Sequence, residues 1–144
     1  MFEEDRKTPL KSFRALWSYA ESQLSKDELK SLLLTTNASG FTIFHETILE
    51  GDEKAFNFIL DVHERILDKE EIKNLILKNF QGNKTLLFKS IGVSIESILM
   101  VWDYIQDLFD DEEETLKKFI SHRDDFGDTA FSCIGWYDTF PKEL

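Results

Sequence analysis

Apolar residues recur at helical spacing along nearly the whole chain. After a polar lead-in over residues 1–11, the i, i+3, i+4, i+7 pattern of an amphipathic helix begins near Ser12 and continues to Leu24. Longer helices are predicted at 53–67 and 95–109, and shorter ones at 26–34, 43–50, 69–78, 86–93, 112–121 and 130–136. The pattern therefore predicts an all-α fold.

Turn residues separate these helices, and the clearest example lies at 37–51. Asn37 and Gly40 tolerate positive φ in a turn. Thr42 can cap the next helix by accepting the backbone N–H of His45, whose side chain can reach back toward the cap. Gly51 ends this helix after about two turns.

The same arrangement returns twice, which indicates a repeat architecture. Thr42, Thr85 and Thr129 are 43 and 44 positions apart. Leu29, Ile72 and Leu116 have the same spacing, and they lie in the similar short helices KDELKSLLL, KEEIKNLIL and EEETLKKFI. We expect a single domain over 1–144, with a partial repeat at 12–36, repeats at 37–79 and 80–123, and a partial repeat at 124–144. The period alone would also suit HEAT or armadillo repeats, but these lack a turn-Gly-x-Thr-x-apolar-His segment.

The first full unit resembles an ankyrin repeat, and the motif residues recur in part elsewhere. The last unit matches through Asp124, Gly127, Thr129 and Phe131, whereas the middle unit has Phe80, Asn83 and Phe88 at the acid, Gly and His positions. The resemblance implies an ankyrin-type helical repeat solenoid with an extra short helix per repeat and short turn or hairpin tips. It assigns a structural role to Asn37, Gly40, Thr42, His45, Gly51, Thr85, Gly127 and Thr129.

Charge and composition narrow the class of partner. The formal net charge of −11 argues against nucleic acid, and it favours either a protein partner with a basic surface or simply solvated helix faces. No apolar run is long enough to cross a bilayer, and the charged N-terminus lacks a signal-peptide segment. A single cysteine suits a reducing compartment. We expect no membrane insertion and a location in the cytoplasm or the nucleus.

The residues that could carry chemistry do not form a known constellation. His45, His63 and His122 have no metal-ligand spacing; His45 is expected to be structural and the other two to lie on the surface. The acidic run from Asp107 to Glu114 lacks the glycine of a calcium loop. No phosphate loop or nucleophile elbow occurs, so we expect no catalytic residue, metal or cofactor, and no enzyme.

The resemblance implies that partner contacts lie in the turns and on the inner helices, where residues vary freely. The candidate binding residues are Phe41, Leu49, Glu50, Lys84, Phe126, Asp128, Trp136 and Tyr137. Trp136 and Tyr137 could instead pack against a following repeat. The expected function is non-catalytic protein–protein binding. The alternatives are a small stand-alone viral or parasite protein resembling inhibitors of NF-κB-type factors, and a structural segment of a longer array.

Overall fold

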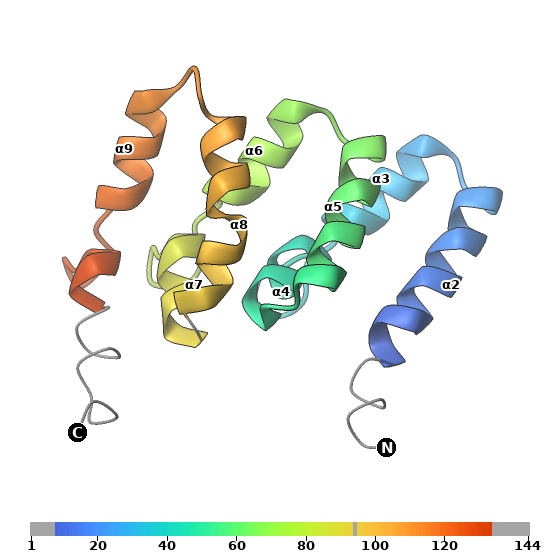
Figure 1. The fold of residues 1–144 in the computed structure, drawn as a ribbon, viewed down its shortest axis with the longest axis horizontal. Coiled ribbons are helices and arrows are strands. Elements are labelled where there is room, and N and C mark those ends of the chain that lie inside the picture. The colour runs from blue at the N-terminus through green and yellow to red at the C-terminus, as the bar shows by residue number, and fades with distance from the viewer. Residues whose placement is uncertain (1–7, 94, 134–144) are drawn as a thin grey trace. The chain divides into compact units, whose positions relative to one another are not determined.

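The chain consists of helices joined by short turns in the computed structural model, which describes residues 8–93 and 95–133 (Figure 1). The helices are α2 (Thr8–Gln23), α3 (Lys26–Leu34), α4 (Ile43–Glu50), α5 (Glu53–Ile66), α6 (Lys69–Leu77), α7 (Leu86–Val93), α8 (Ile95–Leu108) and α9 (Glu113–Ser121), and residues 130–133 are also helical. In these ranges the only extended pairing is an isolated bridge between Phe80 and Lys84. The all-α prediction is confirmed.

The chain divides into two compact units, one ending at Thr35 and the other beginning at Thr36. The first contains α2 and α3. Helix α2 begins at Thr8 rather than at Ser12, because proline is tolerated in the first turn of a helix and Pro9 lies there. Ser25 caps α3 through a capping box with Glu28. The boundary between the units lies beside the predicted start of the first full repeat, and the single-domain assignment stays a prediction.

The core of the second unit forms around α4. This helix packs against α5, α7 and α8, and α7 packs against α8. The central side chains are fully buried because each helix turns its apolar stripe inward; they include Phe44, Ile48, Ile59, Val62, Leu86 and Ile105. The ring of Phe44 lies 6.0 Å from that of Phe56, measured between centroids. This arrangement leaves one edge of α4 and α7 free for the turns that precede them.

Helix ends follow the predicted signals closely. Thr42 is the N-cap of α4 and forms a capping box with His45, while Gly51 ends the helix in the left-handed conformation at φ 73°. Asp68 and Glu71 form a third capping box at the start of α6. Ser94 lies outside the described residues, as does the end of the helix predicted at 130–136.

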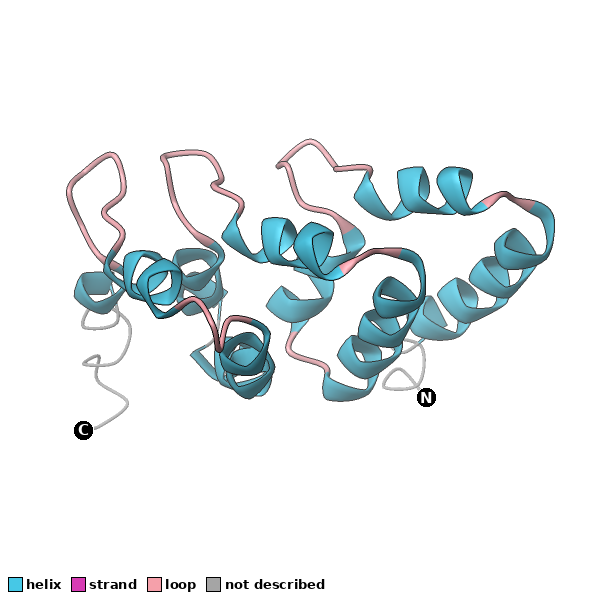
Figure 2. Cartoon of the chain, turned by 90° about the horizontal axis from the view of Figure 1, so that it is seen from above, coloured by secondary structure: helices cyan, strands magenta, loops and turns pink. Residues whose placement is uncertain are grey.

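Three turns lie along one edge of the second unit, as Figure 2 shows in pink. We call them turn 1 (37–41), turn 2 (80–84) and turn 3 (124–128). Each is closed by a hydrogen bond from the N–H of its first residue to the carbonyl of its last, at 2.9, 2.7 and 2.9 Å respectively. The fourth residue has positive φ in every case: Gly40 at 87°, Asn83 at 59° and Gly127 at 83°. Asparagine tolerates the left-handed conformation better than most residues, so Asn83 can replace the glycine of the other two turns.

The turns differ in how they satisfy their remaining N–H groups. In turn 1 the side-chain oxygen of Asn37 accepts from Ser39 and Phe41. In turn 3 the Asp124 carboxylate accepts from Phe126 and Asp128 in the same way. Turn 2 has no such side chain, and here the N–H of the last residue donates to the carbonyl of the first at 3.2 Å, forming the isolated bridge.

We expect Gly40→Val to destabilise the second unit, because a β-branched residue is strained at φ 87°. A side chain here would meet only ordinary van der Waals neighbours, so the cost comes from the backbone and should be about 1–2 kcal/mol. Urea melts measure it. Ser39→Val, at an exposed neighbour without positive φ, is the matched control, and equal losses for the two variants would contradict this explanation.

Candidate functional site

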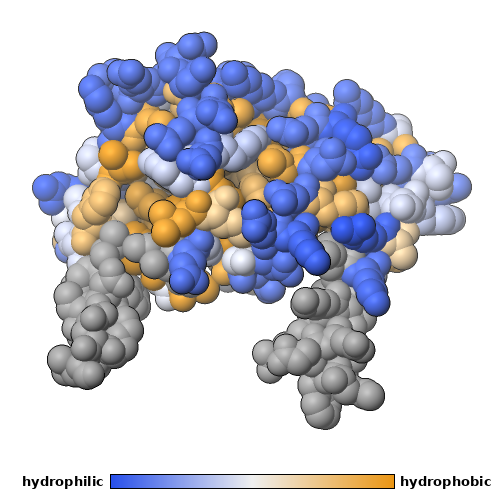
Figure 3. All heavy atoms as spheres, in the orientation of Figure 1, coloured by the Kyte–Doolittle hydropathy of each residue, from blue (hydrophilic) through white to orange (hydrophobic). Residues whose placement is uncertain are grey.

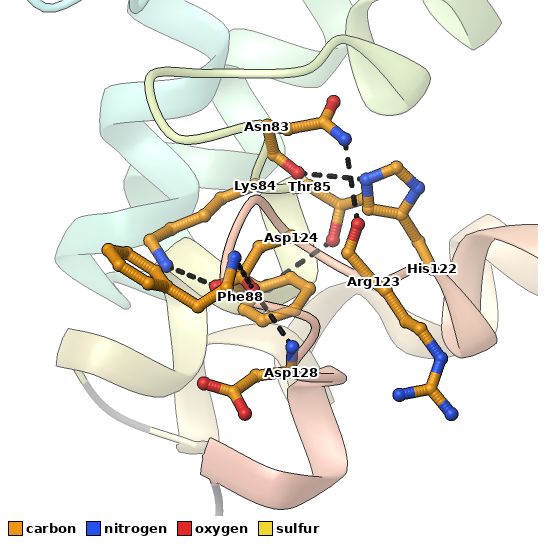
Figure 4. A network of polar contacts seen from close by, with 9 residues as sticks. Asn83, Lys84, Thr85, Phe88, His122, Arg123, Asp124 and Asp128 are labelled. Carbon is orange, nitrogen blue, oxygen red and sulfur yellow. Dashed lines mark hydrogen bonds and ion pairs between the residues drawn. The ribbon is translucent and has the colours of Figure 1, made fainter.

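Side chains that lie two residues before turns 2 and 3 bond to the preceding turn. Lys78 donates from Nζ to the carbonyl of Gly40 at 2.6 Å, and His122, 44 positions later, donates from Nε2 to the carbonyl of Asn83 at 2.8 Å. The backbone of turn 3 also bonds to turn 2, from Asp125 N–H to Gly82 O at 2.9 Å. Figure 4 shows the contacts around turns 2 and 3. These bonds connect consecutive turns into one row.

His45 joins turn 1 to the end of α6 through both ring nitrogens. Nδ1 accepts the backbone N–H of Thr42 at 3.0 Å, and Nε2 lies 2.7 Å from the carbonyl oxygen of Leu75. Because a carbonyl only accepts, Nε2 carries the proton and the ring is neutral. Leu75 is in the last turn of α6, where carbonyls lack a partner within the helix. We call this pair of contacts the His45 bridge.

Burial favours the neutral form of two histidines. His45 and His63 are both fully buried, and desolvation lowers the pKa of each from 6.5 to about 4. The prediction that His63 lies on the surface is wrong: it is on the inner face of α5, with its ring 5.1 Å from that of Phe44. Its Nδ1 donates to the carbonyl of Ile59 at 2.8 Å, and Nε2 has no partner among the described residues.

Lys84 is positioned by an ion pair within the row of turns. Its Nζ lies 2.6 Å from Oδ2 of the buried Asp124 carboxylate and also over the rings of Phe88 and Phe126, at 5.3 and 5.7 Å from their centroids (Figure 4). The hydrogen bond between the two charges raises the pKa of Lys84 and lowers the pKa of Asp124. The pair therefore stays ionised at neutral pH and fixes the lysine between two aromatic rings.

Two adjoining hollows lie beside the turns, and they share Lys84 and Lys89. The larger, of about 480 Å³, is bounded by turn 2 together with Asp125 and Phe126. The other, of about 360 Å³, extends between α4 and α7 and is mainly apolar; its lining includes Phe41, Leu49, Phe88 and Val93. We call the two hollows together the turn-side groove.

The groove brings together several of the predicted binding residues. Phe41, Leu49, Lys84 and Phe126 all line it, although they lie far apart in the sequence. Glu50 and Asp128 are exposed but do not line either hollow, and Trp136 and Tyr137 lie outside the described residues.

Phe88 and Lys89 are among the groove residues that the predicted binding set omitted. Phe88 stands at the motif position of His45, where an imidazole would contribute to the helix cap. Its ring instead lies beneath Lys84 and forms part of the groove wall. Lys89 follows it on α7, and its Nζ lies 5.8 Å from the centroid of the Phe41 ring. A helical projection of 86–93 could have placed both residues near the turn, since Thr85 fixes where the helix begins.

The acidic residues at the start of α9 are not equivalent to one another. Figure 3 shows hydrophilic residues along the edge where α6 and α9 begin. Asp110 and Asp111 are exposed there, whereas Glu112 forms an ion pair with the buried Lys73. The Nζ of Lys73 also lies 3.4 Å from a carboxylate oxygen of Glu70. Glu112 therefore links α6 to the start of α9, and it is less available to a partner than its two neighbours.

The described residues offer no arrangement for metal chemistry and no reactive thiol. In these ranges no three or more His, Cys, Asp or Glu side chains are placed to hold a metal ion. Burial raises the pKa of the Cys133 thiol, which keeps it protonated at neutral pH. No helix of the described chain is long and apolar enough to span a membrane.

Comparisons with protein-family models, curated proteins and solved structures found no match to this chain. The likeness to ankyrin repeats therefore depends on the sequence motif alone.

Substitution of the two buried histidines should change the free energy of unfolding by unequal amounts. His45→Leu leaves Thr42 N–H and Leu75 C=O without partners, and each buried unpaired group costs about 1–3 kcal/mol of unfolding free energy. His63→Leu removes Nε2, which has no partner, and Nδ1, whose acceptor is the Ile59 carbonyl. This carbonyl lies inside α5 and keeps its backbone i→i−4 hydrogen bond, so the cost at pH 7 should be within about 1 kcal/mol. Chemical denaturation at pH 7 distinguishes them; similar losses for the two variants would contradict the special role of His45.

The pH dependence follows from the same two pKa values. Both are lower in the folded chain than the unfolded value of 6.5, so the folded state binds fewer protons below that pH. Their contribution is complete above pH 6.5 and is lost as the pH falls toward 4, by about 3 kcal/mol for each histidine at pH 4. His63→Leu should therefore flatten the stability profile between pH 6.5 and 4. A variant profile parallel to that of the parent would refute this assignment.

Proposed function

We propose that this chain is a non-catalytic protein–protein interaction module of the ankyrin-repeat type, and that it binds its partner through the turn-side groove. The sequence resemblance supports the repeat assignment, together with the hydrogen-bond pattern that recurs in turns 1, 2 and 3. We infer that each repeat of the chain is lengthened by an additional short helix.

One observation carries the binding proposal: the hollow between α4 and α7 is mainly apolar, and the predicted binding residues Phe41 and Leu49 line it. Phe126 is 82% exposed and Val93 is 62% exposed. A folded protein gains little from exposing large apolar side chains beside a hollow, and such sites are commonly covered by a partner. Aromatic side chains are also enriched among the residues that contribute most to binding.

The groove suits recognition better than catalysis. Its basic groups are lysines, one of which is paired with Asp124, and its thiol is protonated. A general base or nucleophile needs a perturbed pKa and a partner within hydrogen-bond reach. His45 and His63 have perturbed pKa values but are fully buried in the core, so they do not supply one. We therefore propose no enzymatic activity.

The negative charge of the chain favours a basic partner at a second surface, away from the groove. The exposed carboxylates of Asp110 and Asp111 favour approach by a partner with a basic surface, through long-range steering. This preference concerns the rate of encounter and not the contacts in the groove.

The experiment compares two equally exposed apolar residues. Val93→Gln, in the groove, should weaken binding of an affinity-purified and identified partner by about 5- to 30-fold, as expected for a buried aliphatic side chain. Leu99→Gln, on α8 and 63% exposed, does not line the groove and should leave affinity unchanged. Both variants should melt near the parent temperature.

Isothermal titration calorimetry gives the affinities, and thermal melting checks folding. If Leu99→Gln weakens binding while Val93→Gln does not, the partner binds the outer helices and the proposed groove function is wrong.

A further inference from the structure

We propose that the turn-side groove binds a protein segment in which an apolar side chain lies next to a carboxylate, and that Lys89 binds this carboxylate. The inference depends on the protein-binding function proposed above and adds the chemistry of the bound segment. The bound segment would be acidic at the groove, whereas the negative net charge of the chain favours a basic partner surface elsewhere.

The charge of the groove differs from that of the chain. The formal net charge is −11, yet the charged side chains lining the hollow between α4 and α7 are Lys84 and Lys89. Lys84 is already neutralised by Asp124 at 2.6 Å. Lys89 makes no ion pair with any carboxylate of the described residues, and its Nζ lies over the Phe41 ring. It therefore presents an uncompensated positive charge beside an apolar surface.

The neighbouring acids indicate where a carboxylate from a partner would lie. Asp125 lines the adjoining hollow, and the charge of Asp128 contributes to the raised pKa of Lys84. A carboxylate near Lys84 would therefore be repelled. Lys89 also borders the hollow that Asp125 lines, but on the side of the hollow between α4 and α7 its neighbours Phe41, Leu49 and Val93 carry no charge. The other charged side chain of that hollow is Lys84, whose charge is already paired with Asp124.

The same surroundings select the apolar side chain of the segment. Leu49 on α4 and Val93 at the end of α7 face the same hollow of about 360 Å³, which has room for an aliphatic or aromatic side chain. An ion pair at the edge of an apolar contact is partly protected from water, so it contributes more than a fully exposed pair. The apolar contact would supply affinity, and Lys89 would supply selectivity for an acid over its amide.

The test uses a phage-displayed library of random 12-residue peptides, selected on the parent chain. Peptides are kept if they fail to bind the Leu49→Gln, Val93→Gln double variant. A cooperative thermal melt of this variant checks that it is folded. The kept peptides should be enriched in Asp or Glu within two positions of a large apolar residue. Fluorescence anisotropy then measures each dissociation constant.

A double-mutant cycle isolates the proposed pair. Lys89→Met should weaken peptide binding about 5- to 10-fold, and changing the peptide Glu to Gln should weaken binding to the parent chain equally. The two changes together should cost no more than either one, because both remove the same contact. Lys54→Met removes an exposed lysine outside the groove and should leave the dissociation constant unchanged.

Salt provides a second criterion. Because the chain is strongly negative, the association rate of an acidic peptide should not fall as salt rises, whereas that of a basic peptide should.

Groove-dependent peptides without an acid, or a Glu-to-Gln effect that persists in Lys89→Met, would overturn the carboxylate assignment alone. Failure to select any groove-dependent peptide would overturn the proposed function as well.

Discussion

The His45 bridge is the contact on which the arrangement of the turns depends. One neutral imidazole satisfies the N–H of Thr42 at the start of α4 and the carbonyl of Leu75 at the end of α6, two groups that helix geometry leaves without partners. Its ring also meets the Phe80 ring edge-on at 5.0 Å, so turns 1 and 2 share it. The bridge works only while the ring is uncharged, because protonation would point a second N–H at the donor of Thr42.

The contacts that hold consecutive turns together differ in kind along the row. Phe41 packs on Phe80 between turns 1 and 2, at 4.7 Å between ring centroids, whereas turns 2 and 3 are joined by the Lys84–Asp124 pair and by backbone bonding. These contacts fix the backbone of the groove before any partner arrives. Preorganisation of this kind lowers the entropy cost of binding, so a modest apolar hollow can still bind usefully.

The positions of the helices and turns could be predicted from the sequence, because both depend on local residue type. The spacing of Thr42, Thr85 and Thr129 located the turns, and Gly51 located the end of α4. The buried site of His63, the pairing of Glu112 with Lys73 and the place of Lys89 in the groove depend instead on which helices pack together. Periodicity gives the inner face of a helix but not its neighbour, so these contacts required the structure.

Amide hydrogen exchange of the free protein, followed by NMR, tests most directly whether the groove is preformed. The N–H of Thr42 donates to His45, and the N–H groups of Lys84 and Asp128 each donate to an acceptor within their own turn, so all three should exchange slowly. The N–H groups of Ala38 and Gln81, both exposed residues of the same turns, have no such acceptor among the described contacts and should exchange quickly. Equally fast exchange at all five positions would show that the turns are not fixed in the absence of a partner, and would contradict this account.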